Sequence, residues 1–287
     1  MGAWGPASSL IRSARHSEVM AGRGRWTLPD LESALGWARE RKGQGIRCTL
    51  ATLGEYARSP AEARAETDEN IACLRGIRAL SADASLSVKL SGIGGLFDGD
   101  AARANLVQLA REARTDNVPI ELDMEGKGMV DLTLRAASEC RKEIPHVTVA
   151  LQSYLSRTGD DIRRMVPEGV SVRLVKGAYI GDTSDASEIR RMTEADARLL
   201  KSLRAPFSLG THDPDLISWA EGEFGGAREL LEFGFLRGLS DETKIRLARD
   251  GWKVSEYVPF GPGGDAYVMR RERYLRELAG SGRAPAP

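Results

Sequence analysis

Short runs of β-branched and other apolar residues recur along the chain and are separated by longer amphipathic segments. The apolar runs lie at residues 46–53, 86–90, 118–123, 147–152, 170–176, 206–212, 229–236 and 252–260. Between them, the segments 61–80, 101–115, 129–142 and 186–202 carry charged faces at helical spacing. Strands that alternate with helices are typical of βαβ units and a parallel sheet. The pattern therefore predicts an α/β protein.

The number of units favours a closed barrel. Eight βα units are what a TIM-type (β/α)8 barrel requires. A doubly wound open sheet is the alternative, but no Gly-x-Gly-x-x-Gly sequence follows the first strand, where a dinucleotide-binding fold carries it. We expect one barrel domain over residues 46–280, an arm of extra N-terminal helices over 1–45, and a flexible tail over 281–287.

Composition narrows the function classes. The 41 Lys and Arg residues balance 41 Asp and Glu residues, which argues against the broad basic surface that nucleic acid requires. Aromatic residues make up only 6%, which disfavours a base-stacking surface. The 3 cysteines form no Cys-x-x-Cys pair, so we expect neither a disulfide framework nor a zinc site. No run approaches the ~18 apolar residues of a membrane span.

Polar residues gather at the predicted carboxyl ends of the strands, where barrel enzymes place their chemistry. A charge inside an apolar strand needs a partner or an anionic ligand. A core ion pair of Lys89 or Arg173 with a nearby acid is the structural alternative, but polar groups at six strand ends favour a site. These groups are Lys89, Asp123 with Glu125, Gln152 with Tyr154, Arg173 with Lys176, Thr211 with His212, and Tyr257.

The segment 265–278 predicts a last helix that carries a second set of candidates. Tyr267, Arg270 and Arg271 share one face at spacings i, i+3 and i+4, and Tyr274 continues that face. A solvated basic face is the ordinary interpretation. However, a Gly-rich loop joins this helix directly to the eighth strand and would place it over the barrel mouth. Paired guanidinium groups suit a carboxylate or phosphate there.

No metal site is expected, because His212 is the only histidine at a strand end and no His-x-His or His-Glu-x-x-His spacing is present.

Several short motifs, taken in order, resemble the proline dehydrogenase family, in particular its monofunctional members. The resemblance covers residues 46–277 and is most specific at VRLVKGAY and in the last helix. The motifs are SVKLSG (87–92), ELDME (121–125), QSYL (152–155), VRLVKGAY (172–179), TH (211–212), EF (232–233), YVPFG (257–261), and Tyr267 with Arg270 and Arg271.

The resemblance implies a FAD-dependent enzyme on a distorted (β/α)8 barrel. It would oxidise the C5–N bond of L-proline to 1-pyrroline-5-carboxylate, passing hydride to flavin N5 and electrons on to a quinone-like acceptor. A cytoplasmic location follows, with peripheral contact to the inner membrane left open.

The resemblance also implies residue roles. Asp123 and Arg173 would be catalytic, with Arg173 near flavin N5. Arg270 and Arg271 would clamp the substrate carboxylate. The other substrate contacts would be Lys89, Leu174, Tyr257 and Tyr267, and the cofactor contacts Met124, Gln152, Arg173, Lys176, Gly177, Ala178, Thr211 and His212.

The chain departs from the family pattern near the substrate and the flavin edge. Tyr274 stands where the last helix usually has Glu, Ile180 where an aromatic follows KGAY, and Gly234 directly after the EF motif, where the family pattern reads EFQM. A same-fold flavoenzyme acting on a substituted proline or another cyclic imino acid is therefore an alternative. An inactive barrel kept as a binding or regulatory module is a second one, although the retained charged set speaks against it.

Overall fold

The computed structural model describes residues 24–79 and 83–280, with side chains as far as residue 276. The predicted tail at 281–287 and residues 1–23 of the predicted arm lie outside this range. The strands form one closed barrel in the order β1 to β8, and every neighbouring pair is parallel. They are β1 (Ile46–Thr52), β2 (Ala84–Val88), β3 (Ile120–Leu122), β4 (Val147–Gln152), β5 (Ser171–Val175), β6 (Phe207–Gly210), β7 (Leu231–Leu236) and β8 (Lys253–Phe260). The predicted (β/α)8 barrel is confirmed.

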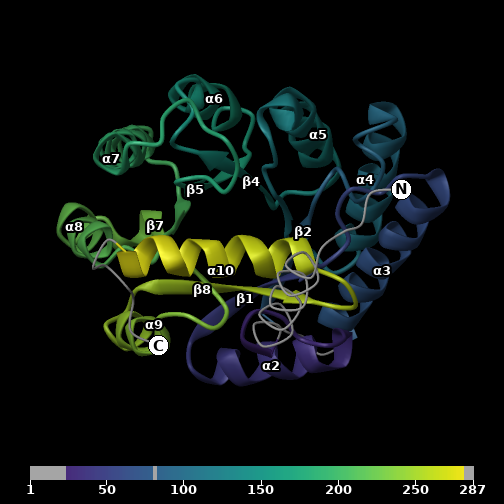
Figure 1. Ribbon diagram of the computed structural model, residues 1–287, viewed down its shortest axis with the longest axis horizontal. Coiled ribbons are helices and arrows are strands. Elements are labelled where there is room, and N and C mark those ends of the chain that lie inside the picture. The colour runs from purple at the N-terminus through teal and green to yellow at the C-terminus, as the bar shows by residue number, and fades with distance from the viewer. Residues whose placement is uncertain (1–23, 80–82, 281–287) are drawn as a thin grey trace, which may run out of the picture.

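Helices surround the barrel (Figure 1). They are α2 (Leu31–Gly43), α3 (Pro60–Ala79), α4 (Gly99–Arg114), α5 (Val130–Glu143), α6 (Thr158–Met165), α7 (Ala186–Ser202), α8 (Pro214–Phe224), α9 (Asp241–Arg249) and α10 (Asp265–Gly280), with 3-10 turns η1 (Lys127–Met129) and η2 (Arg228–Leu230). Aspartates at positions 30, 98, 185 and 213 cap helices, because their carboxylates accept first-turn backbone N–H groups. No helix in the described part of the chain is both long and apolar enough to cross a membrane.

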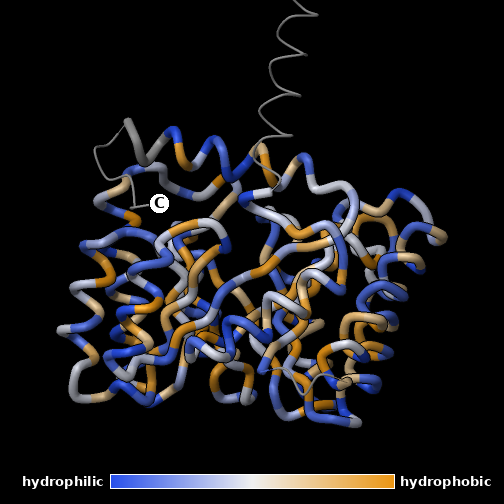
Figure 2. Tube along the Cα trace, turned by 90° about the horizontal axis from the view of Figure 1, so that it is seen from below, coloured by the Kyte–Doolittle hydropathy of each residue, from blue (hydrophilic) through white to orange (hydrophobic). Residues whose placement is uncertain are grey.

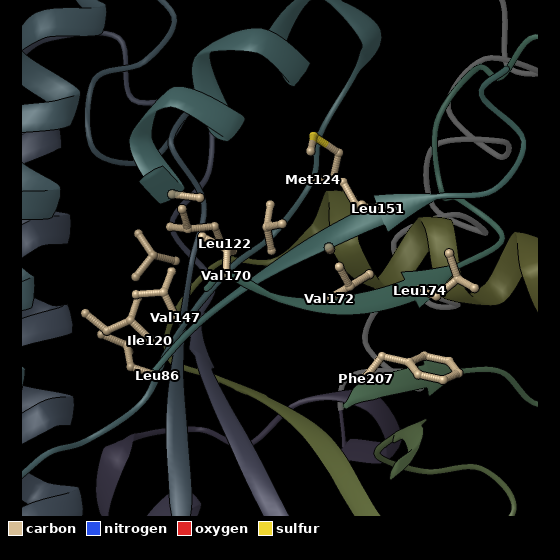
Figure 3. Packing of buried hydrophobic residues seen from close by; sticks show 14 of the residues in the cluster. Leu86, Ile120, Leu122, Met124, Val147, Leu151, Val170, Val172, Leu174 and Phe207 are labelled. Carbon is tan, nitrogen blue, oxygen red and sulfur yellow. The ribbon is translucent and has the colours of Figure 1, made fainter. Parts of the chain in front are cut away.

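Alternate residues of each strand face two different environments. Leu122, Leu151, Val172 and Leu174 belong to the apolar cluster that packs on the helix side of the strands (Figure 3). The opposite face of the barrel wall is polar: Glu121 of β3 bonds to side chains of both β1 and β5, which are not its neighbours in the sheet. Such contacts have to cross the barrel interior, so this interior carries charge.

Helix α10 lies across one end of the barrel (Figures 1 and 2). The loop before it contains Gly261, Gly263 and Gly264, all with positive φ, a conformation that glycine adopts without strain. Contacts from α10 reach the loop after β1 through Glu55 and the loop after β5 through Lys176. The predicted position of the last helix over the mouth is therefore observed.

Candidate active site

Three of the predicted site residues meet at a fourth, Asp123, which directly follows β3. Arg173 of β5 donates from Nη2 to Asp123 Oδ1. Tyr257 of β8 donates its hydroxyl proton to Asp123 Oδ2 at 2.6 Å, and Lys89 Nζ, just beyond β2, lies 3.1 Å from the same oxygen. Lys89 also donates to the Tyr257 hydroxyl at 3.1 Å. Side chains from β5, from β8 and from the residue just beyond β2 thus converge on one carboxylate.

The charges of this group follow from burial and pairing. Burial opposes ionisation of Asp123, but Lys89 and Arg173 outweigh it and hold the pKa of that carboxyl well below its usual range. Burial also opposes the charge of Arg173, yet Asp123 and Glu121 raise the pKa of its guanidinium. Burial and the Asp123 charge raise the pKa of the Tyr257 phenol. At neutral pH the group therefore holds an ionised Asp123 beside two cations and a neutral Tyr257.

Glu121 supports the group from inside the barrel, a role the sequence motif alone did not assign. Its Oε2 accepts from Arg173 Nη1 at 2.8 Å, and its Oε1 accepts from Thr49 at 2.7 Å, Ser85 at 2.5 Å and Arg47 at 3.2 Å. The position of Glu121 two residues before Asp123 is a usable signal, because both then share one face of the strand.

Helix α10 adds two arginines with different partners. Arg270 Nη2 contacts both carboxylate oxygens of Glu55, at 2.7 and 2.9 Å. Arg271 instead lies over the ring of Tyr267, 4.8 Å from its centroid, and pairs with no carboxylate among the side chains described. The Nε of Arg271 and the hydroxyl of Tyr267 are both buried without a hydrogen-bond partner in that part of the chain. The Tyr267 ring stacks on Tyr257, with centroids 6.5 Å apart and planes at 23°.

The turn after β5 is shaped by Tyr154. A Cβ on Gly177, which has φ +124°, would lie 1.7 Å from Tyr154 Cε1. The Tyr154 hydroxyl accepts from Tyr179 N at 2.8 Å and donates to Gln152 Oε1 at 2.8 Å. This arrangement fixes the turn that carries Lys176 and Ala178. Lys176 is exposed, and its Nζ lies 5.2 Å from the centroid of the Tyr274 ring.

His212 and Thr211 follow β6 and are held by the protein itself. His212 Nε2 accepts from the backbone of Leu236 at 3.1 Å, so the ring proton sits on Nδ1, 3.0 Å from Ser240 Oγ. Burial, with the nearby charges of Lys244 and Arg271, lowers the pKa of His212 to about 3. Thr211 Oγ1 accepts from the Asp213 backbone at 3.1 Å. His212 is therefore neutral with both nitrogens occupied. No cluster of His, Cys, Asp or Glu suited to a metal occurs among the described residues.

Leu174 is the predicted substrate contact that the structure does not bring to this group. It is fully buried in the apolar cluster outside the barrel wall, because it alternates with the inward-facing Arg173 (Figure 3). Leu236, the last residue of β7, pairs in register with Tyr257. It was not among the site residues predicted from the sequence. It shares a strand face with Glu232, whose carboxylate accepts from Ser255. Met124 is buried beside Asp123.

The residues present fit a flavin nucleotide in their charge. FAD carries a diphosphate, which an unpaired cation can bind through charge-assisted hydrogen bonds. Lys176 is exposed and has no carboxylate partner within the described side chains, so its ammonium group is available to a phosphate.

Curated proteins with similar sequences are proline dehydrogenases. The chain is 29% identical to proline dehydrogenase 2 of Bacillus subtilis (strain 168), over 84% of this chain and 82% of the relative. It is also 29% identical to a proline dehydrogenase of Deinococcus radiodurans, over 88% of each.

Solved structures share the fold. Proline utilization A (PutA) from Bdellovibrio bacteriovorus, inactivated by N-propargylglycine, matches with a TM-score of 0.81 at 20% identity. That match covers 93% of this chain but 34% of the PutA chain, so the protein spans about a third of that larger molecule.

The sequence model of the family described as "Proline dehydrogenase" matches residues 34–198, which is more than half of the chain. The match includes Lys89, Asp123 and Arg173, the charged residues that meet inside the barrel mouth. The chain therefore belongs to the proline dehydrogenase family, a family of oxidoreductases that act on CH–NH donors.

Proposed function

We propose that this protein is a FAD-dependent enzyme that oxidises L-proline at its C5–N bond to 1-pyrroline-5-carboxylate. The observation that carries the proposal is that Lys89, Arg173 and Tyr257 hold Asp123, while Arg271, on the Tyr267 ring that stacks on Tyr257, has no carboxylate partner among the described side chains. Membership of the proline dehydrogenase family supports it. The catalytic unit would be the barrel over residues 46–280, preceded by the arm over 1–45.

The substrate carboxylate would bind at α10. Arg271 offers a guanidinium that no carboxylate in the described part of the chain neutralises, and charge-assisted hydrogen bonds to such a group are strong. Arg270 would join it by exchanging Glu55 for the substrate, and Lys89 would add positive charge from below. The stacked rings of Tyr257 and Tyr267 would cover the apolar pyrrolidine ring.

The redox step would be assisted by charged side chains that the protein holds in fixed positions. When bound, FAD supplies the hydride acceptor. Asp123 stays ionised and so favours positive charge on the substrate nitrogen as the C5–H bond is lost. Arg173, held by Glu121 and Asp123, would keep positive charge beside the cofactor. The cofactor contacts proposed by resemblance are Met124, Gln152, Arg173, Lys176, Gly177, Ala178, Thr211 and His212.

Electrons would then pass to a quinone-like acceptor. Such an acceptor resides in the membrane, so the proposal includes a cytoplasmic enzyme with peripheral contact to the inner membrane.

Arg271→Ala tests the carboxylate clamp. Loss of a charge-assisted contact costs roughly 1.5–3 kcal/mol, so the KM for L-proline should rise about tenfold to hundredfold. Arg273→Ala, an exposed arginine on the same helix, is the matched control and should leave KM near the wild-type value. An unchanged KM in Arg271→Ala refutes the clamp.

A second candidate function is oxidation of a substituted proline or another cyclic imino acid by the same site. The departures at Tyr274, Ile180 and Gly234 favour testing it, since Ile180 is 85% exposed where the family pattern has an aromatic residue. Yellow protein that L-proline fails to reduce, but a substituted proline reduces, would establish this alternative. Protein that stays colourless with added FAD would remove both candidates.

A further inference from the structure

The cations predicted at the barrel mouth fall into two groups by partner. Lys89 and Arg173 pair with Asp123, and Arg270 pairs with Glu55. Lys176 and Arg271, in contrast, lie over aromatic rings and have no carboxylate partner among the described side chains. The two groups differ in what they can still bind, because among the described residues the charge of the second group is not neutralised by a carboxylate.

Tyr274 is the ring that faces Lys176. It packs against an apolar cluster in which Tyr267 and Val268 of α10 join Trp26, Leu53 and Leu239, so its position is held from behind. Lys176 Nζ lies 5.2 Å from its centroid. This contact joins α10 to the turn after β5, whose shape Gly177 and Tyr154 fix.

A tyrosine acts on a lysine differently from the glutamate that the family pattern has at this position. A carboxylate would form an ion pair and cancel the ammonium charge. An aromatic face attracts the ammonium within about 6 Å of its centroid and leaves the charge in place. The ring also limits the directions that the long Lys176 side chain samples, so less entropy is lost when it binds an anion.

We propose that Tyr274 is a positioning residue that holds Lys176, fully charged, for the diphosphate of the flavin nucleotide. This inference rests on the proposed function, since it takes FAD as the ligand. Tyr274 itself is assigned no contact with the cofactor. It acts through Lys176, whereas the glutamate of the family pattern would compete with the phosphates for the same ammonium.

The test is the FAD dissociation constant of the full-length protein, measured by equilibrium dialysis. Tyr274→Leu removes the ring and should weaken FAD binding roughly twofold to fivefold, the range of a cation–π contact at an exposed site such as Lys176. Tyr274→Phe keeps the ring and should bind FAD like the wild type. Tyr274→Glu should bind more weakly than Tyr274→Phe, because the new carboxylate neutralises Lys176.

A double-mutant cycle with Lys176→Met separates positioning from packing. If Tyr274 acts through Lys176, the Leu substitution should have no further effect on FAD affinity in the Lys176→Met background. An equal loss in both backgrounds, or wild-type affinity in Tyr274→Leu, overturns the inference. Failure of the wild type to bind FAD is a different outcome and counts against the proposed function itself.

Discussion

Gly177 is the residue at which the turn after β5 is most constrained. Its φ of +124° is rarely adopted by residues that carry a Cβ, and the space where a Cβ would stand is filled by the Tyr154 ring. That ring is anchored in turn by hydrogen bonds to Gln152 and to the backbone of Tyr179. Gly177 thus determines the backbone positions of its two neighbours, Lys176 and Ala178.

Gly177→Ala should destabilise the protein and weaken FAD binding together. The backbone strain alone is about 1–3 kcal/mol, and the clash with Tyr154 adds to it. Gly126→Ala is the matched control, because Gly126 also follows a strand but has φ −63°, and a Cβ at this position would have no atom within 4 Å. Thermal unfolding and FAD dialysis would measure both effects. Equal melting temperatures for the two variants would contradict this role of Gly177.

The sequence predicted the central residues of the site but not all of their partners. Lys89, Asp123, Arg173 and Tyr257 could be found because charged or phenolic groups at strand ends of a barrel meet at one mouth. The direction of the Leu174 side chain could also have been predicted from strand alternation. Leu174 is the neighbour of Arg173, so the two side chains must face opposite sides of the barrel wall.

The pairing of Glu55 and of Leu236 with site residues could not be predicted from the sequence in this way. Glu55 meets Arg270 only because α10 folds back over the loop after β1. Leu236 meets Tyr257 through the register of β7 and β8. Both depend on how distant segments are placed, which local patterns do not encode.

Among the elements, the strands were predicted best because their apolar runs are short, β-branched and bounded by charged segments. The observed strand ends differ from the predicted ones where another secondary-structure element occupies the same residues. The run 229–236 yields β7 from Leu231 only, since Arg228–Leu230 forms η2. The short helices α6 and α9 span 8 and 9 residues, too few for a clear helical period.

Asp196 on α7 makes the helix layer sensitive to pH. Burial raises the pKa of Asp196 to about 6, although Arg163 partly opposes this. The folded protein therefore binds this proton more tightly than the unfolded chain does. The stabilisation is complete below the ordinary aspartate pKa and is lost as the pH rises through about 6.

Asp196→Asn should remove that pH dependence. Between about pH 4.5 and about pH 7, an interval that covers most of the range over which this stabilisation is lost, the wild type should lose on the order of 2 kcal/mol of unfolding free energy relative to the variant. Urea unfolding at both pH values measures this difference. Asp68→Asn, at an exposed position on α3, should follow the wild type. Parallel pH profiles for the wild type and Asp196→Asn would count against the burial of this carboxyl.

At the scale of the whole molecule, α10 closes the barrel end through contacts with three separate parts of the chain. Glu272 accepts from Trp26 Nε1 at 2.5 Å, Arg270 pairs with Glu55, and Tyr274 lies against Lys176. The net charge of the chain is zero, and most cations at the mouth beneath this helix pair with carboxylates. Lys176 and Arg271 are exceptions, because neither has a carboxylate partner among the described side chains.

The central claim is that this mouth binds L-proline and lets it reduce a bound flavin. The most direct measurement is an anaerobic titration of the FAD-loaded protein with L-proline, followed by flavin absorbance. We expect the oxidised flavin band to bleach with saturation. Pyrrolidine, which has the same ring without a carboxylate for Arg271, should require a far higher concentration. A flavin that stays oxidised at saturating L-proline would contradict the claim.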